Sequence, residues 1–152
     1  MRRGWFLALA VMTARADAAE PARFGIETVA LDPSAPALAG PFIALVWKSD
    51  CAPCLVELGY LERLQEAAGG RLVSIALDPP GVARATLDER NVPSHAAYAA
   101  SGDPAGILAG LAGGQTRLPL SVAVTASGEI CASHVGLLGT DMAAEWSRSC
   151  SK

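Results

Sequence analysis

The stretch WKSDCAPCLVEL, residues 47–58, joins a buried strand to a helix and places two cysteines at the junction. Before it, PFIALVW (41–47) is a continuous apolar run, typical of a strand covered on both faces. After it, apolar residues recur at spacings of three and four as far as Ala68, which predicts one helix ended by Gly69 and Gly70. RLVSIAL (71–77) follows as a second buried strand. Strand, helix and strand at this spacing predict a right-handed βαβ unit with parallel strands.

The rest of the chain predicts an antiparallel part of the same sheet. LSVAVTASGEICASHVG (120–136) has two β-rich runs around Ala126, Ser127 and Gly128, which predicts a hairpin. Residues 82–91 and 94–112 are rich in alanine and are predicted to be mostly helical, and Thr140 is predicted to cap a last helix. The predicted fold class is therefore α/β, with one mixed β-sheet, made of the βαβ unit and the C-terminal hairpin, flanked by helices on both faces.

The composition indicates one globular domain, and the N-terminal sequence indicates that this domain is exported. Of 152 residues, 51% are hydrophobic and 18% are charged, and the formal net charge of −3 offers no basic stripe for nucleic acid. The first residues, MRRGWFLALAVMTARADA, combine arginines, a short apolar segment and small residues, as in a secretory signal peptide. Because the apolar segment is far shorter than the ~20 residues that span a bilayer, we predict a cleaved signal over 1–18 and a domain over 19–152; a retained membrane anchor or a lipid anchor is the alternative. The predicted location is the periplasm, where disulfides form and persist.

The spacing of Cys51 and Cys54 favours a redox-active pair. Cys51 precedes the first turn of the predicted helix, where unpaired N–H groups and the helix dipole stabilise a thiolate. Cys54 lies one turn further on the same face, and Pro53 is compatible with a first turn. The alternatives are weaker. A structural disulfide would gain little from closing so short a loop, and a zinc site would need two more ligands, for which His95 and His134 lack suitable spacing.

At this point the chain resembles the thioredoxin superfamily, in particular exported thiol-disulfide oxidoreductases of the TlpA/ResA type. VWKSDCAPCLVEL is similar to their active-site segment, and TRLPLSVAVTASGEI resembles the segment that carries their cis-proline. The resemblance implies that Cys51 exchanges disulfides with the substrate and that Cys54 resolves the mixed disulfide. It also implies a cis bond between Leu118 and Pro119. The residues that the resemblance assigns to substrate binding are Trp47, Pro53, Leu118 and Pro119.

Two positions depart from the pattern of this family. Asp50 precedes the first cysteine, where relatives usually have tryptophan or another apolar residue, and its carboxylate is expected to raise the pKa of Cys51. Leu45 stands where cytoplasmic thioredoxins have a buried acid, which leaves Glu57 as the nearby carboxylate to carry the proton of Cys54. An ordinary helix glutamate favoured by the dipole is the alternative for Glu57, and a proline that opens an edge strand is the alternative for Pro119.

Cys131 and Cys150 are the candidates for a structural disulfide. The last strand and the last helix run in opposite directions over similar lengths, so the chain returns to about the level at which Cys131 stands. A disulfide between them would stabilise the fold by about 3 kcal/mol. The rival interpretation is a second redox pair that relays electrons to Cys51 and Cys54, although no neighbouring residue activates these thiols.

The sequence thus predicts an exported, monomeric thiol-disulfide oxidoreductase that uses no cofactor and no metal. Its expected partner is an exported protein with a cysteine pair, and the resemblance implies apocytochrome c as a candidate and a membrane thiol-disulfide carrier as the redox partner. The direction of electron flow depends on a reduction potential that the sequence leaves open. Two other classes also stay open: a copper chaperone of thioredoxin fold for oxidase assembly, and a binding module with an inert disulfide.

Overall fold

The computed structural model describes residues 20–152, so the predicted signal peptide lies outside the described part of the chain. Six strands form one sheet in the order β1-β4-β3-β2-β5-β6. The strands are β1 (Thr28–Ala30), β2 (Phe42–Trp47), β3 (Leu72–Ala76), β4 (Ala97–Ala100), β5 (Leu120–Val124) and β6 (Ile130–Val135). β2 runs parallel to β3 and β3 to β4, whereas β1, β5 and β6 run antiparallel to their neighbours. This mixed sheet confirms the predicted fold class.

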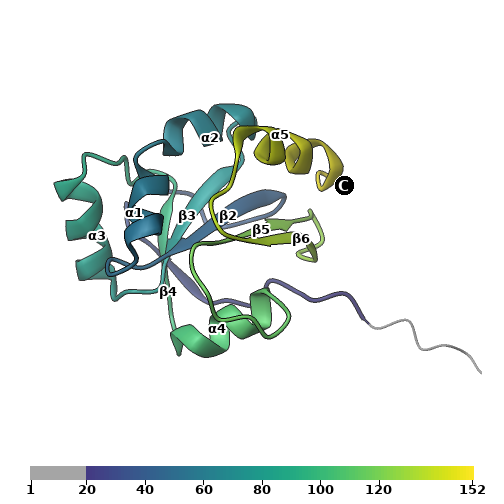
Figure 1. The fold of residues 1–152 in the computed structure, drawn as a ribbon, viewed down its shortest axis with the longest axis horizontal. Coiled ribbons are helices and arrows are strands. Elements are labelled where there is room, and N and C mark those ends of the chain that lie inside the picture. The colour runs from purple at the N-terminus through teal and green to yellow at the C-terminus, as the bar shows by residue number, and fades with distance from the viewer. Residues whose placement is uncertain (1–19) are drawn as a thin grey trace, which may run out of the picture.

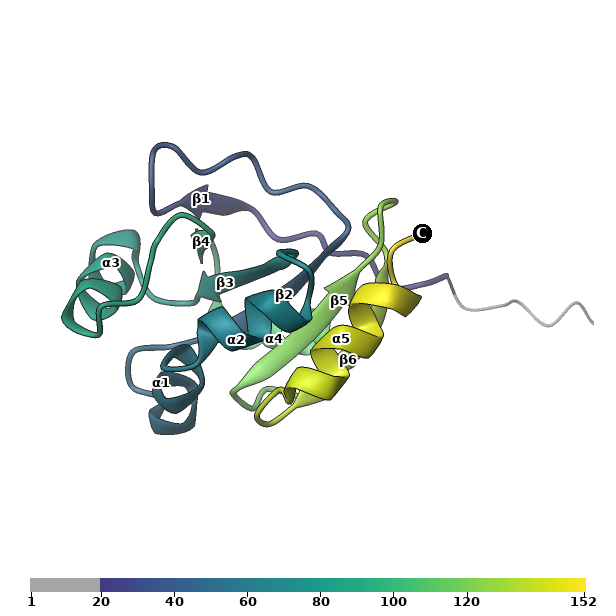
Figure 2. The same ribbon diagram turned by 90° about the horizontal axis from the view of Figure 1, so that it is seen from above.

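Helices cover both faces of the sheet (Figures 1 and 2). They are α1 (Ala52–Leu58), α2 (Leu61–Ala67), α3 (Pro80–Glu89), α4 (Pro104–Leu111) and α5 (Thr140–Ser149). Buried residues of α1, α2, α3 and α5 share one hydrophobic cluster, and those of α4 belong to a second cluster on the other face. Within residues 20–152, no helix is long and apolar enough to cross a membrane.

Strand β2 forms the centre of both hydrophobic clusters because it is covered on both faces. All six of its residues are buried. Side chains alternate along a strand, so Ile43, Leu45 and Trp47 contribute to the cluster under α1, α2 and α5, while the residues between them contribute to the cluster under α4. Burial on both faces is the physical reason why this strand is a continuous apolar run.

The predicted single helix after the cysteines is in fact two short helices. Its apolar spacing was predicted well, since the residues from Cys54 to Ala68 that follow it are buried. The helix breaks at Gly59 and Tyr60, whose N–H groups donate to the carbonyls three residues back, those of Val56 and Glu57. Such bonds tighten a last helical turn, and glycine lowers the helix propensity at that point.

The prediction of helix over most of 94–112 is wrong for its first part, which contains strand β4. Alanine favours helix in isolation, but here Ala97 and Ala99 pair with the edge of β3, and the small side chains fit the covered sheet. Tyr98 is buried, and its hydroxyl donates to the carbonyl oxygen of Pro36 at 2.8 Å. Pairing that completes the sheet therefore outweighs local propensity in this segment.

The C-terminal part agrees with the prediction in outline. β5 and β6 form the hairpin, and the N–H of Gly128 donates to the carbonyl oxygen of Thr125 in its turn. Gly128 has φ of 82°, a conformation that favours glycine. The predicted cap is off by one residue: Gly139 is the N-cap of α5, Thr140 is its first residue, and no side chain caps this end.

Candidate active site

The two cysteines of CAPC lie where β2 passes into α1. A turn of three residues follows Trp47, and the N–H of Cys51 donates to the carbonyl oxygen of Lys48 at 3.1 Å. Cys51 is the N-cap of α1, and its Sγ accepts a hydrogen bond from the N–H of Cys54 at 3.3 Å. The structure joins the two residues in a disulfide with a Cα–Cα distance of 5.3 Å. The end of the helix thus directs an N–H donor at one of the two sulfurs.

The two cysteines differ in how far a partner can reach them. Cys51 is half-buried, whereas Cys54 is 1% exposed and belongs to the hydrophobic cluster below α1. Pro53, between them, is exposed. Cys51 is therefore the more exposed of the two cysteines, and its predicted role as the residue that exchanges with the substrate stays a prediction.

Glu57 lies one helical turn after Cys54, on the same buried side of α1. It is 2% exposed, and its Oε1 accepts a hydrogen bond from the backbone N–H of Leu138 at 2.6 Å. Burial raises the pKa of Glu57 from 4.5 to about 7, and the bond from Leu138 opposes part of this rise. Burial and the charge of Glu57 also raise the pKa of Tyr60. A carboxyl group that titrates near neutral pH can both accept and return a proton.

The alternative interpretation of Glu57, a surface glutamate favoured by the helix dipole, does not match its position. Glu57 is the penultimate residue of α1, and the first turn of this helix has no acidic residue. A glutamate near the C-terminal end of a helix is disfavoured by the dipole. Its burial is also unlike that of a solvated glutamate, such as the exposed Glu62 of α2.

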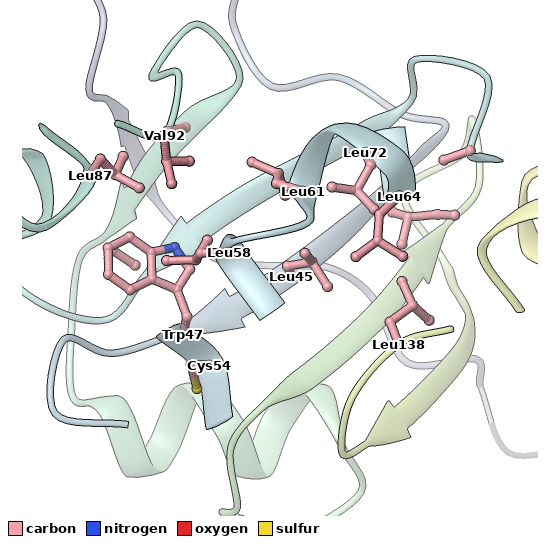
Figure 3. Close-up of a cluster of buried hydrophobic side chains, with 14 of the residues drawn as sticks. Leu45, Trp47, Cys54, Leu58, Leu61, Leu64, Leu72, Leu87, Val92 and Leu138 are labelled. Carbon is pink, nitrogen blue, oxygen red and sulfur yellow. The ribbon is translucent and has the colours of Figure 1, made fainter. Parts of the chain in front are cut away.

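Trp47 lies in the hydrophobic core, in the same buried cluster as Cys54. Its side chain is 1% exposed, in the same cluster as Cys54 and Leu58 (Figure 3). The indole Nε1 has no hydrogen-bond partner among the described residues. The predicted role of Trp47 in binding a substrate stays a prediction, and its burial places it behind Cys54 rather than at the surface.

Leu118 and Pro119 lie beside the end of β2. Val46 pairs with Leu120, so the residue before Leu120 stands level with Trp47, the last residue of β2. The peptide bond between Leu118 and Pro119 is cis, as is that between Gly40 and Pro41. Pro119 is buried and its carbonyl oxygen accepts from the N–H of Gly136, whereas Leu118 is half-buried. The register thus brings the predicted substrate segment to the end of the sheet that carries Cys51.

The turn before Cys51 contains two polar contacts, neither of which was predicted from the sequence. Asp78 follows β3 and is 8% exposed, and its Oδ2 accepts from the N–H of Ser49 at 2.6 Å. Its only signal in the sequence is its place between a buried strand and two prolines. Asp50, the departure from the family pattern, pairs with Lys48 at 3.3 Å, and its side chain is 73% exposed. The cation and the solvent both weaken the effect that Asp50 has on Cys51.

Cys131 and Cys150 form a disulfide far from this site. Their Cα atoms are 5.8 Å apart, Cys131 is exposed and Cys150 is 5% exposed. Cys131 stands next to Ile130, which pairs with Val124 at the end of β5, whereas Cys51 lies at the end where β5 begins. The two disulfides are therefore at opposite ends of the sheet. A structural role for the second disulfide stays a prediction.

The two histidines lie far from the cysteine pair in the chain. His134 is half-buried on β6, opposite Ser121, and His95 is exposed just before β4. Among residues 20–152, no group of three or more His, Cys, Asp or Glu side chains is arranged to hold a metal ion.

Comparison with solved structures indicates which fold this is. No protein-family model matches the sequence, and no curated protein matches it. Among the structures that match is a thioredoxin-related protein from Neisseria meningitidis serogroup B, with a TM-score of 0.62 and 20% identity over 80% of this chain and 96% of that one. StoA from Bacillus subtilis has a TM-score of 0.55 and 19% identity over 72% and 84%. A thiol:disulfide interchange protein of the thioredoxin family from Chlorobium tepidum has a TM-score of 0.52 and 18% identity over 72% and 78%. The chain therefore has a thioredoxin-like fold, with the Cys51–Cys54 pair where its central strand enters the first helix.

Proposed function

We propose that this protein is an exported thiol-disulfide oxidoreductase that exchanges two electrons with cysteine pairs of other exported proteins. The observation that carries the proposal is the unequal environment of the two cysteines. Cys51 is half-buried, while Cys54 is 1% exposed and lies one helical turn from Glu57, a carboxyl group whose pKa burial raises to about 7. An inert disulfide needs no such asymmetry and no buried carboxyl group.

In the direction of substrate reduction, the thiolate of Cys51 attacks one sulfur of the substrate disulfide. The S–S bond of the substrate breaks, its other sulfur leaves as a thiolate, and a mixed disulfide forms. Cys54 then loses its proton and attacks the Cys51 sulfur, which releases the second substrate thiolate and closes the disulfide seen here. Two electrons have then passed from the cysteine pair to the substrate. Substrate oxidation is the same sequence in reverse, and neither direction calls for a cofactor.

Glu57 is the residue that we assign to the proton of Cys54. A buried thiol is a poor nucleophile until it is deprotonated, and water has little access to it. Glu57 is one turn away on the same side of α1, and its pKa of about 7 lies close to that of a thiol. It would accept the proton during resolution and return it when the pair is reduced again.

Export, the partners and the oligomeric state are part of the proposal. The N-terminal sequence supports export, and four cysteines in two disulfides suit an oxidising compartment. In this setting the substrate is an exported protein with a cysteine pair, with apocytochrome c as one candidate. A membrane thiol-disulfide carrier would restore the working state of the cysteines, and the protein would act as a monomer.

Trapping of the mixed disulfide tests the proposal. In a Cys54→Ser variant the resolving thiol is missing, so the reduced protein should accumulate a covalent adduct with a disulfide-containing protein such as insulin. The matched Cys51→Ser variant should form none, because its remaining thiol is buried. Equal adduct formation by the two variants, or equal insulin reduction by wild type and both variants, would remove the catalytic assignment.

A further inference from the structure

Asp78 is a buried acid that the disulfide exchange described above does not use. It follows β3 at the end of the sheet that carries Cys51, and it is 8% exposed. Within residues 20–152, no basic side chain forms an ion pair with it. A buried carboxylate without a cation is costly unless hydrogen bonds replace the lost water. The hydrogen-bond partner of Asp78 therefore indicates what this residue does.

That partner is the backbone of the turn that leads to Cys51. The N–H of Ser49, the middle residue of the turn, donates to Oδ2 of Asp78 at 2.6 Å. It is the only hydrogen bond that Ser49 makes within the described part of the chain. Where the turn begins, the N–H of Leu77 donates to the carbonyl oxygen of Trp47 at 2.9 Å. Asp78 thus ties the middle of the turn to the end of β3, next to a tie that the backbone already makes.

The position of Cys51 depends on this turn most when the disulfide is open. In the oxidised protein the bond to Cys54 itself fixes Cys51, and the two Cα atoms are 5.3 Å apart. In the reduced protein and in the mixed disulfide this bond is missing. Cys51 is then held at the start of α1 by the turn and by the N–H of Cys54 that donates to its sulfur. A tie to the turn therefore restricts the open states more than the closed one.

We propose that Asp78 is a positioning residue, which keeps the sulfur of Cys51 in line for Cys54 while their disulfide is open. The inference rests on the proposed function, because it concerns the closing of that same disulfide. In the closing step Cys54 attacks the Cys51 sulfur of the mixed disulfide, the bond to the substrate breaks, and the substrate sulfur leaves as a thiolate. Two sulfurs that are held in place react more readily than two sulfurs of which one is on a loose turn.

The variant Asp78→Ala removes the acceptor and frees the turn in the open states. We expect the equilibrium constant for closing the disulfide to fall about tenfold, the usual scale for one hydrogen bond to a charged group. This change raises the reduction potential by about 30 mV. Resolution of the mixed disulfide should slow by about tenfold as well, because Cys54 then meets a misplaced sulfur. The first attack of Cys51 on a small disulfide should change much less, because it does not depend on the alignment with Cys54.

Two matched variants separate this role from charge and from general stability. Asparagine is uncharged but still offers an oxygen to Ser49, so Asp78→Asn should keep the potential and the resolving rate close to those of the wild type. Asp103 caps α4 on the other face of the sheet, where its Oδ2 accepts from the N–H of Gly106 at 2.8 Å. Asp103→Ala removes a comparable bond, so it should lower the stability and leave both redox quantities unchanged.

Three measurements give the quantities that are needed. Equilibration with mixtures of reduced and oxidised glutathione gives the reduction potential of each protein. Rapid-quench analysis of a single turnover with a peptide disulfide gives the rates of the first attack and of resolution. Hydrogen exchange of the Ser49 amide in the wild type requires no variant, and we expect this amide to be protected in the oxidised and in the reduced protein.

The outcomes that overturn the inference differ from those that refute the proposed function. Wild-type values of the potential and the resolving rate in Asp78→Ala would overturn it, and so would equal changes in Asp78→Asn or in Asp103→Ala. Should Asp78→Ala not fold, loss of protection at the Ser49 amide on reduction of the wild type would overturn it alone, and retained protection would support it. Failure of the wild type to react with the peptide disulfide would refute the proposed function, and the inference with it.

Discussion

Replacing Glu57 with glutamine should make the protein more stable above neutral pH and less active. Burial raises the pKa of Glu57 to about 7 from 4.5, so the native state binds this proton more tightly than the unfolded chain does. The contribution of protonated Glu57 to the free energy of unfolding is therefore fully present below pH 4.5 and is lost as the pH rises through about 7. At about 1.4 kcal/mol for each pKa unit, the ionised carboxylate costs roughly 3 kcal/mol in the free energy of unfolding.

Glutamine removes this cost because it is uncharged and still offers an oxygen to the N–H of Leu138. At about pH 8 the Glu57→Gln variant should be more stable than the wild type by up to about 3 kcal/mol, and the difference should shrink toward about pH 4. The same variant cannot take a proton from Cys54. We therefore expect the step that resolves the mixed disulfide to slow by about a hundredfold, within the range of a lost general base.

Urea unfolding of the oxidised proteins, followed by circular dichroism at several pH values, measures the first effect. The exposed Glu62 on α2 provides the matched control, since Glu62→Gln should leave the pH dependence as it is in the wild type. Rapid-quench analysis of the mixed disulfide measures the second effect. The reasoning would be refuted by a Glu57→Gln variant that is less stable than the wild type at alkaline pH, or by one that keeps the wild-type pH dependence.

Three further predictions concern other parts of the structure. Asp50→Asn should lower the pKa of Cys51 in the reduced protein by less than about one unit, because solvent screens the carboxylate, and the wild-type pKa should stay above ~4. The ultraviolet absorbance of the thiolate measures both values, and a higher Cys51 pKa in the variant would contradict the effect assigned to Asp50. Removal of the second disulfide by Cys131→Ser and Cys150→Ser together should cost about 3 kcal/mol of unfolding free energy and leave the reduction potential of the active pair unchanged, whereas a shifted potential would favour the relay. Leu64→Ala, in the core beneath α2, should cost about 3 kcal/mol in urea unfolding, and a loss below about 1 kcal/mol would contradict its role in the core.

Much of the fold was predictable because its central elements carry strong local patterns. β2 and β3 are apolar runs of strand length, and the hairpin of β5 and β6 has a glycine at the turn. β4 was not predictable in this way, because AYAA has the composition of a helix and becomes a strand only through pairing with β3. The break at Gly59 was likewise hidden within an apolar spacing that continues across it.

In the candidate site too, features set by nearby residues could be predicted from the sequence and features set by distant residues could not. The spacing of Cys51 and Cys54, with a helix behind them, was readable because both residues act through local geometry. The environment of Glu57 was not, because its partner Leu138 comes 81 residues later in the chain. The contact between Ser49 and Asp78 joins residues 29 positions apart and could not be predicted from the sequence either. Burial and pKa values depend on such distant neighbours, so these properties appear only in the folded chain.

The position of the C-terminus has a practical consequence. The carbonyl oxygen of Lys152 accepts from the N–H of Ala126 in the turn between β5 and β6, and the disulfide of Cys150 anchors the preceding helix to the same region. Strand β5, about 16 Å long, separates this region from the end of the sheet that carries Cys51. A fluorophore, an affinity tag or an electrode attached after Lys152 would therefore leave the reactive end unobstructed. Electrochemistry on an oriented layer of the protein is thus a direct way to measure its reduction potential.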